Sequence, residues 1–392
     1  MNSYSEWIEY LFWKADGAGA PLSGSFELTA RCNLDCKMCY IHKRANDPIV
    51  RQKELSTKEW LGLAAASQKR GMLLLLLTGG EPLLRPDFRE IYAGCRKLGL
   101  LISINTNGTL MTDEMVEFLA KDPPMRVNLT LYGASPETYE RLCGDPGAYA
   151  RAYHAVEQLR QAKVPVKLNY SMTPLNQADM SAVYAYAKER QLLIQTATYM
   201  FPPVRACETG PCAIRRLSPE EAGKARFEYD CYRFEEEQLK IRLERILAGQ
   251  QIENLDSECQ ELPTERIRCR AGSTTFWMTY DGQMRPCGMM QMPAVDARTV
   301  GFDSAWEQIR REREKIMLPA KCTACQWKNI CEFCPAACYA ENGHFETVPE
   351  YLCQKTHVYL LCGQKWLFGK SGQKKTEETP DRKSEHPADM MK

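Results

Sequence analysis

Residues 32–39 read Cys32-Asn33-Leu34-Asp35-Cys36-Lys37-Met38-Cys39, and the spacing of their three cysteines is C-x3-C-x2-C. Three thiolates at this spacing can hold three irons of a cubane cluster and leave the fourth iron open to an outside ligand. The chain has 18 cysteines among 392 residues, so this spacing would arise by chance about 0.04 times. The stretch therefore predicts a site for a four-iron, four-sulfur (4Fe–4S) cluster.

The segments on either side of this cysteine loop strengthen that interpretation. A strand-like run, residues 25–30, leads into the loop, and the sequence Gly-Gly-Glu-Pro at 79–82 closes the next apolar run. Together with the cysteine spacing, this arrangement resembles the radical S-adenosylmethionine (SAM) enzymes. The resemblance implies that the amino and carboxylate groups of SAM chelate the open iron. It also implies that the reduced cluster donates one electron, which releases a 5′-deoxyadenosyl radical from SAM.

The same resemblance assigns residues to the SAM site. Glycine lets the backbone approach a ligand, and a carboxylate suits an ammonium, so the Gly-Gly-Glu turn is expected to contact the amino group of SAM. Two further strand ends carry polar residues at positions that family members place near the cofactor. The residues carried over in this way are Gly79, Gly80, Glu81, Asn107 and Thr130.

Several positions depart from the family pattern. Tyr132 stands where the family has an acidic residue, and Met38 stands where many members have an aromatic residue that shields the cluster. A soft apolar thioether can still cover the cluster. The arginine that often binds the SAM carboxylate would fall near Cys143, and whether Arg141 substitutes for it stays open.

The sequence between residues 25 and 200 alternates between strand-like and helix-like patterns. Helix starts are recognisable from the capping box that begins at Ser56, from Pro86-Asp87 and from Thr112. Strands followed by helices indicate a parallel sheet with right-handed crossovers, so we expect an α/β fold, a partial (β/α)6 barrel with its site at the carboxyl ends of the strands. The expected strands are 25–31, 72–78, 101–105, 126–132, 164–171 and 194–200.

The chain divides by composition into five parts. The charged stretch that follows the barrel is interpreted as a solvated bridging helix with i,i+4 ion pairs, and the Lys/Glu/Ser/Pro-rich end of the chain as a disordered tail. The predicted boundaries are 1–24 for a lead-in helix and linker, 25–217 for the barrel, 218–258 for the helical bridge, 259–369 for a cysteine-rich domain and 370–392 for the tail.

A second cysteine block fills residues 269–353. An Asp281-Gly282 turn predicts a β-hairpin that brings Cys269 and Cys287 together. This block resembles the SPASM arrangement, which implies two auxiliary 4Fe–4S clusters. The chain departs from the pattern at one position. The fourth cysteine of C-x2-C-x5-C-x3-C should fall at residue 335, where this chain has proline, and Cys334 comes one residue early. We assign Cys269, Cys287 and Cys334 to the first auxiliary cluster, and Cys322, Cys325, Cys331 and Cys353 to the second.

Several cysteines keep alternative interpretations. Cys338 and Cys259 compete as a fourth ligand for the first auxiliary cluster, which otherwise keeps an open iron. Zinc is an alternative for the second block, because two C-x2-C pairs can form a tetrahedral site, and His42 could complete a zinc site with the first trio. The remaining cysteines are expected to be packing residues, apart from a redox-active alternative for one pair. These are Cys95, Cys143, Cys231 and Cys362, and the pair Cys207 and Cys212.

Composition excludes several classes of protein. Net charge is +1 from 51 basic and 50 acidic residues, so nothing indicates binding to nucleic acid or another polyanion. The first residues lack the basic and apolar regions of a signal peptide, and the longest apolar run, 72–77, is too short to span a membrane. We therefore expect a cytoplasmic protein in which clustered cysteines bind metal.

The function implied by the resemblance is hydrogen abstraction from a peptide or protein substrate, in the maturation of a ribosomal peptide. A flavodoxin or ferredoxin-type protein is the expected reductant. The 24 residues before the barrel are too few for the leader-peptide module of many peptide maturases. Sulfatase maturation is the alternative, but those enzymes carry an Asp after the G-x4-C cysteine, where this chain has Gly288. A non-catalytic iron–sulfur or zinc protein is a third possibility.

Overall fold

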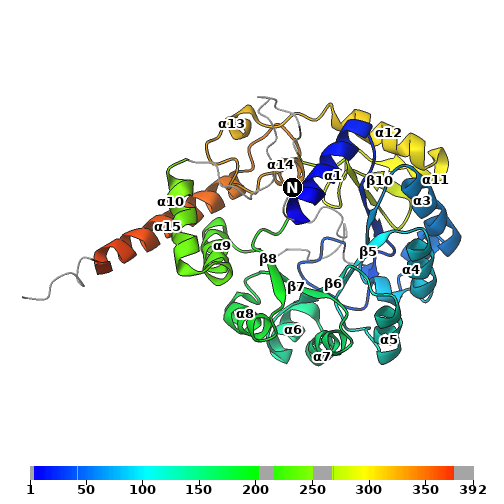
Figure 1. Ribbon diagram of the computed structural model, residues 1–392, viewed down its shortest axis with the longest axis horizontal. Coiled ribbons are helices and arrows are strands. Elements are labelled where there is room, and N and C mark those ends of the chain that lie inside the picture. Colours follow the sequence, from blue (N-terminus) through cyan, green and yellow to red (C-terminus); the bar gives the residue numbers. More distant parts are fainter. Residues whose placement is uncertain (1–3, 42, 203–215, 250–266, 268, 375–392) are drawn as a thin grey trace, which may run out of the picture.

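The computed structural model describes residues 4–41, 43–202, 216–249, 267 and 269–374. Within these residues the central element is a nine-stranded sheet, with strand order β11-β10-β9-β1-β4-β5-β6-β7-β8. Figure 1 shows helices α3 to α8 in an arc around the outer side of this sheet. Residues 203–215, 250–266 and 375–392, which belong to the predicted barrel end, helical bridge, cysteine-rich domain and tail, lie outside the described residues.

Six strands of the sheet form the barrel that the sequence predicts. Neighbouring strands from β1 to β8 pair in parallel, for example Phe26 of β1 with Leu77 of β4. Each strand lies within a few residues of its expected range, so the prediction of an α/β partial barrel is confirmed. The strands are β1 (Ser23–Glu27), β4 (Leu74–Thr78), β5 (Leu101–Thr106), β6 (Arg126–Leu131), β7 (Val166–Ser171) and β8 (Leu193–Ala197).

Three of the helices between these strands, α3, α4 and α5, begin where the sequence indicates. Ser56 forms a complete capping box with Glu59 at the start of α3, and the Thr112 hydroxyl accepts the N–H of Met115 at the start of α5. Asp87 precedes α4 but makes no capping bond with its side chain. The elements are α2 (Pro48–Lys53), α3 (Thr57–Lys69), η1 (Pro82–Leu84), α4 (Phe88–Lys97), α5 (Asp113–Lys121), α6 (Pro136–Cys143), α7 (Gly147–Gln161), η2 (Gln177–Asp179) and α8 (Met180–Glu189).

Alternate residues of the barrel strands face two different environments, because side chains along a strand point to opposite faces. On β6, Val127, Leu129 and Leu131 are fully buried in the main apolar core. On the other face of the same strand, the side-chain amide of Asn128 donates to Asn105 of β5 at 2.8 Å. The barrel therefore has an apolar shell under its helices and a polar inner face.

The C-terminal region continues the same sheet. The predicted hairpin forms around Asp281-Gly282, with β9 (Thr275–Met278) antiparallel to β10 (Gln283–Arg285), and β10 pairs in turn with β11 (Val295–Asp296). Strand β9 also pairs in parallel with β1, from Ser23 opposite Thr275 to Phe26 opposite Met278. This pairing was not foreseen, and it ties the cysteine-rich region to the barrel by main-chain hydrogen bonds.

The expected solvated bridge is instead a packed helical unit. Two helices, α9 (Pro219–Arg233) and α10 (Glu236–Leu247), lie against the long α15 (Glu350–Lys374) in Figure 1. An apolar stripe of α10, Leu239, Leu243 and Ile246, packs on Tyr359 and Leu360 of α15. The prediction of a solvated bridge is therefore wrong about exposure. The charged residues on either side of this apolar stripe had indicated a helix exposed to solvent.

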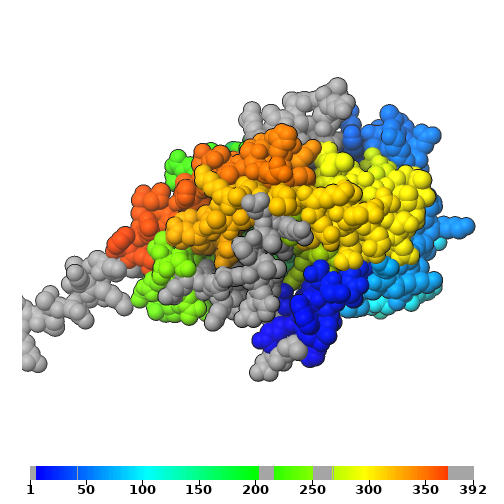
Figure 2. Space-filling view, turned by 90° about the horizontal axis from the view of Figure 1, so that it is seen from above, coloured from blue at the N-terminus to red at the C-terminus, as the bar shows by residue number. Residues whose placement is uncertain are grey.

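The remaining elements complete the two ends of the chain. Helix α1 (Tyr4–Ala18) confirms the lead-in helix, and the Gly19 carbonyl that follows it accepts the indole N–H of Trp306 at 2.9 Å. Figure 2 shows the C-terminal region, coloured yellow to red, across one broad face of the molecule. Helix α15 runs to Lys374, so the first residues of the expected tail are helical. The other elements are β2 (Arg31–Cys32), β3 (Lys43–Arg44), α11 (Ala297–Val300), α12 (Phe302–Arg313), α13 (Ala320–Thr323) and α14 (Pro335–Asn342).

Helix length and apolarity can be checked against the membrane prediction. Across the part of the chain that the structure describes, no helix is both long enough and apolar enough to cross a bilayer.

Candidate metal centre and cofactor site

The cysteine loop is held between a short strand pair and the end of a helix. Residue Cys32 ends β2, which pairs in parallel with β3. From the other side, the carbonyls of Leu142 and Cys143 at the end of α6 accept the N–H groups of Lys37 and Asp35 at 2.9 and 3.0 Å. The last carbonyls of a helix have no partner within it, so the loop amides complete them.

The three thiols of this loop are close enough to influence one another. Burial raises the pKa of Cys32 well above its usual range, and the nearby charges of Glu81, Cys36 and Cys39 raise it further. Such thiols ionise readily only if positive charge lies among them, which iron supplies. The chemistry of the donor set therefore fits a metal cluster.

A single ion fits this set of thiols less well. Among the residues that the structure describes, no three His, Cys, Asp or Glu side chains gather at the spacing of one metal ion. In a 4Fe–4S cluster each cysteine binds a different iron, so the thiols need not converge on one point. The zinc alternatives thus gain no support, and His42 lies outside the described residues.

The end of β5 reaches the first cysteine. The side-chain amide of Asn107 lies 3.6 Å from the thiol of Cys32 and donates to the Asn33 carbonyl oxygen at 3.0 Å. Its own oxygen accepts the N–H of Thr109 at 2.9 Å, and the Thr109 hydroxyl accepts the amide of Asn33 at 2.8 Å. Asn107, which the sequence predicted as a SAM contact, is therefore bound to the cysteine loop itself.

Glu81 also makes its contacts within the protein. Its buried carboxylate accepts the N–H of Leu83 at 3.0 Å, the hydroxyl of Thr106 at 2.8 Å and the N–H of Asn107 at 2.8 Å. Burial raises the pKa of this carboxyl group to about 7, although these three donors oppose the shift. Three of roughly four acceptor positions are thus occupied, and Glu81 fastens the end of β4 to the end of β5.

The two glycines before Glu81 are required by a close approach of two backbones. A Cβ atom at Gly79 would lie 2.3 Å from the carbonyl oxygen of Thr29, and one at Gly80 would lie 2.4 Å from that of Arg31. The N–H of Gly80 donates to the Thr29 carbonyl at 2.7 Å. These glycines therefore seat the end of β4 directly against the segment that enters the cysteine loop.

Tyr132 and Cys143 lie beside the cysteine loop, although the sequence analysis gave neither a role there. The thiol of Cys143 hydrogen-bonds with Cys36, and this contact and burial raise the pKa of Cys36, whereas a hydrogen bond from Tyr132 lowers it. Thr130 is half-buried on β6 and shares a strand face with Tyr132, two residues on. The signal was available in the sequence, because positions 132 and 143 were among those that departed from the family pattern.

A cavity opens beside the cysteine loop. It is lined by the loop, by β3 and by the residues that end α6 and follow it. Its wall combines the basic side chains Lys43 and Arg44 with the acidic side chains Asp35 and Asp145, next to Cys32. A wall with both signs of charge suits a ligand that carries an ammonium and a carboxylate.

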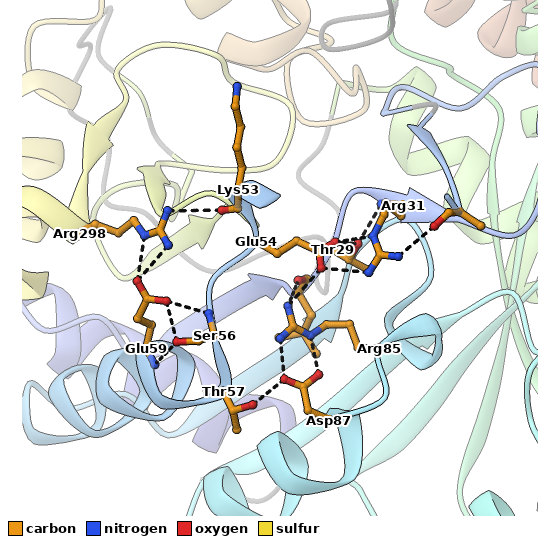
Figure 3. Close-up of polar contacts among 12 residues, drawn as sticks. Thr29, Arg31, Lys53, Glu54, Ser56, Thr57, Glu59, Arg85, Asp87 and Arg298 are labelled. Atoms are coloured by element: carbon orange, nitrogen blue, oxygen red, sulfur yellow. Dashed lines mark hydrogen bonds and ion pairs between the residues drawn. The ribbon is translucent and has the colours of Figure 1, made fainter. Parts of the chain in front are cut away.

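A network of buried charges supports the strand that enters the loop (Figure 3). Glu54 accepts hydrogen bonds from Arg31 at 2.8 and 3.0 Å and from the Thr29 hydroxyl, and lies 3.7 Å from Arg85. Arg85 continues to Asp87, with contacts of 2.9 and 2.6 Å. Sequence reasoning missed this network, because its members are separated along the chain and match no motif.

Two C-terminal cysteines, Cys334 and Cys322, lie near other members of the groups to which the sequence analysis assigns them. Burial raises the pKa of Cys334 to about 12, and Cys287 and Cys269 add to the shift. Burial likewise raises the pKa of Cys322 to about 11, with contributions from Cys331, Cys353 and Cys325. Interactions of this kind require proximity, so Cys287 and Cys269 lie near Cys334, and Cys331, Cys353 and Cys325 lie near Cys322.

Cys338 lies between the two groups. It is fully buried, and burial raises its pKa to about 12, with additions from Cys322 and Cys331 of the second group and from Cys334 of the first. The competing ligand Cys259 lies outside the described residues, as do Cys207 and Cys212.

Comparisons with known proteins agree with this geometry. The model of the Radical SAM superfamily matches residues 26–187. An AdoMet-dependent heme synthase of Methanosarcina barkeri is 29% identical over 83% of this chain and 94% of its own length. A PqqA peptide cyclase of Rhizobium meliloti is 31% identical, over 46% of this chain and 48% of its own.

Solved structures share the fold at lower identity. The structure of anSMEcpe with bound AdoMet superposes with a TM-score of 0.66 at 19% identity, over 90% of this chain and 96% of that one. SuiB of Streptococcus suis bound to S-adenosylmethionine gives 0.59 at 19%, over 86% and 78%. With the cysteine loop, the parallel barrel and these relatives together, the chain is a radical SAM enzyme that uses a 4Fe–4S cluster and SAM, and its SPASM-type relatives extend over most of its length.

Proposed function

We propose that Cys32, Cys36 and Cys39 hold the SAM-cleaving cluster. When bound there, the cluster supplies the electron that cleaves SAM reductively. The protein's part is to hold three crowded thiols at the carboxyl ends of the strands. Asn107 fixes Cys32 through its amide, and the Tyr132 hydroxyl donates to Cys36.

SAM itself would occupy the space beside the same loop. Its methionine part carries an ammonium and a carboxylate, which suits the mixed charges of the cavity next to Cys32. Lys43 and Arg44 are our candidates for the carboxylate, since the family arginine would fall near Cys143 and Arg141 donates to Thr138 and to the Leu175 carbonyl. Gly79, Gly80 and Thr130 do not line this cavity, and they stay predicted contacts on the basis of the resemblance alone. The bonds of Glu81 and Asn107 support an indirect role for their side chains.

The two C-terminal groups would hold auxiliary 4Fe–4S clusters. Cys322, Cys325, Cys331 and Cys353 offer four thiols to one cluster, as the sequence assigned them. The group of Cys269, Cys287 and Cys334 has three thiols and one near neighbour, Cys338, which is our candidate for its fourth ligand. Zinc would be the contradicting finding, and a metal analysis of protein purified without oxygen distinguishes the two.

For the substrate, the extent of the alignments favours a tetrapyrrole. Three AdoMet-dependent heme synthases align over 86–94% of their own length and over 81–84% of this chain. The peptide cyclases align over less than half of theirs. We therefore propose that the enzyme abstracts hydrogen from an iron porphyrin, in a reaction of the heme synthase type.

Peptide maturation, the prediction from the sequence, is the second candidate. It is favoured by 31% identity to a PqqA peptide cyclase and by a fold shared with SuiB, whose structure was solved with its precursor peptide. The sulfatase alternative is weakened at Gly288, where a Cβ atom would already lie 3.0 Å from the Trp277 ring. An aspartate at that position would need the ring to move.

The deciding experiment supplies both substrate classes to the same enzyme. The chain is reconstituted with iron and sulfide without oxygen and incubated with SAM and dithionite, and 5′-deoxyadenosine is measured. Iron coproporphyrin III is then added in one arm and a set of Cys- and Ser/Thr-rich peptides in another. Heme in the first arm supports the proposal, whereas a modified peptide with an unchanged porphyrin contradicts it. A flavodoxin or ferredoxin replacing dithionite tests the expected physiological reductant.

A further inference from the structure

A buried positive charge lies beside the second group of C-terminal cysteines. The side chain of Lys355 is 1% exposed, and its ammonium donates to the carboxylate of Glu332. Glu332 follows Cys331 directly in the sequence, and Lys355 is two residues after Cys353. The Lys355 ammonium also interacts electrostatically with the Cys331 thiol.

The charge is enclosed by three elements. Lys355 lies on α15, where α9 packs so closely that a Cβ atom at Gly223 would be 2.6 Å from the Lys355 carbonyl oxygen. Glu332 comes from the loop between Cys331 and α14. Figure 1 shows α9 and α15 side by side at this end of the molecule. Water therefore screens the ammonium poorly.

The carboxylate of Glu332 does not neutralise Lys355 alone. Its other oxygen lies 3.7 Å from the guanidinium of Arg226, on α9, and the Glu332 side chain is half-exposed. Arg226 in turn lies over the Tyr359 ring at 4.6 Å. The next acid on α9, Asp230, is engaged with Arg233 and Arg242. Two cations thus share one carboxylate, which leaves an excess of positive charge within this group of three side chains.

Burying an ammonium is costly unless negative charge compensates it. Four thiolates outweigh the positive charge of a 4Fe–4S core, so the assembly carries net negative charge, and this charge grows on reduction. A fixed positive charge nearby therefore favours the reduced form and raises the midpoint potential. The cation and the thiolates compensate each other.

We propose that Lys355 is a positioning residue that sets the midpoint potential of the auxiliary cluster held by Cys322, Cys325, Cys331 and Cys353. This inference rests on the auxiliary-cluster part of the proposed function. Glu332 acts in the opposite direction, because its carboxylate reduces the positive charge that the cluster experiences. A higher potential would let this cluster accept an electron from a substrate radical.

The test is a redox titration of the anaerobically reconstituted full chain, followed by electron paramagnetic resonance. Lys355→Met should lower the midpoint potential of this cluster by about 59 mV, which corresponds to a tenfold change in the equilibrium constant for one-electron reduction. Lys355→Arg keeps the charge and should restore the wild-type midpoint. Glu332→Gln should move the midpoint upward. Lys224→Met, at an exposed pair on α9, removes the same charge in water and should leave it unchanged.

The outcomes distinguish a failure of the proposal for Lys355 from a failure of the auxiliary-cluster assignment on which it rests. If Cys325→Ala removes one cluster signal but Lys355→Met leaves that signal's midpoint unchanged, the proposal for Lys355 is overturned and the cluster assignment stands. If Cys325→Ala removes no signal and no iron, both fail. Should Lys355→Met not fold, Glu332→Gln decides alone, since a purely structural ion pair predicts no upward shift from it.

Discussion

The carboxylate of Glu81 accepts the main-chain N–H of Asn107 at 2.8 Å, and the amide side chain of Asn107 reaches the thiol of Cys32 at 3.6 Å. Glu81 thus acts on the first cysteine through one intermediate residue. Motif comparison assigns Glu81 to ligand binding, but in this structure its side chain supports the cysteine loop through Asn107. Its protonation should therefore affect the stability of the fold.

The stability of the protein should fall as pH rises through the pKa of Glu81. Burial raises this pKa from 4.5 to about 7, so the folded state holds the proton more tightly than the unfolded state. The contribution of Glu81 to the free energy of unfolding is greatest below about pH 4.5. It decreases by on the order of 3 kcal/mol as the pH rises to about 7. Denaturation midpoints measured from pH 5 to 8 test this. Glu81→Gln has no such proton, and parallel pH profiles for the two proteins would contradict the assignment.

Cys36→Ala should abolish formation of 5′-deoxyadenosine. The variant lacks one of three thiols that hold the SAM-cleaving cluster, so the open-iron site cannot form. The product is measured by chromatography after incubation with SAM and dithionite. Cys231→Ala, an exposed cysteine of α9, is the matched control and should keep full activity. Cleavage that persists in Cys36→Ala would refute its role as a ligand.

Glu54→Gln should destabilise the protein and lower the iron content of the first cluster. Removing this carboxylate leaves Arg31 and Arg85 buried with less compensating charge, and breaking a buried pair costs about 3–5 kcal/mol. Both arginines flank the strand that enters the cysteine loop. The exposed pair partner Glu220 offers a control, and Glu220→Gln should change little. Unchanged melting and iron content in Glu54→Gln would disprove the supporting role.

Arg313→Lys should selectively weaken the first auxiliary group. The Arg313 guanidinium donates to the carbonyls of Ile267, Cys269 and Ala271 at 2.8–2.9 Å, and a lysine cannot reproduce this fork. We expect iron content to fall by about one cluster while SAM cleavage persists. Iron and sulfide analysis measures the loss, and the exposed neighbour Arg311→Lys is the control. Equal iron in both variants would argue against the prediction.

Lys43→Met and Arg44→Met should weaken SAM binding. Both side chains line the cavity beside Cys32. If removing one partner of the SAM carboxylate costs about 1.4 kcal/mol of binding free energy, the dissociation constant rises about tenfold. Equilibrium dialysis with labelled SAM gives the constant directly. Lys37 lies exposed on the same loop outside the cavity lining, so Lys37→Met should bind normally. If all three variants bind alike, the carboxylate site lies elsewhere.

Much of the fold was predictable because its signals are local. The six barrel strands are apolar runs with recognisable ends, and the helix caps at Ser56 and Thr112 need only neighbouring residues. The hairpin at Asp281-Gly282 is of the same kind. The division of the C-terminal cysteines into two groups came from the resemblance to the SPASM arrangement, and it stays a prediction.

The rest depended on contacts between distant parts of the chain. The pairing of β1 with β9 joins residues about 250 positions apart, and nothing in either strand names its partner. The burial of α10 depends on an apolar stripe whose neighbours are charged, so its composition indicated exposure. The indirect role of Glu81 is set by three donors that only the folded chain brings within reach.

The pairing of β9 with β1 has a consequence for anyone who shortens the gene. Strand β1 is an interior strand only because residues 275–278 cover one side of it. A chain cut after the barrel would present that side as a row of unsatisfied peptide groups, an open template for adding strands from other molecules. Such a fragment should precipitate or form intermolecular sheets, and insolubility of an isolated barrel would then report an uncovered edge rather than a missing cofactor.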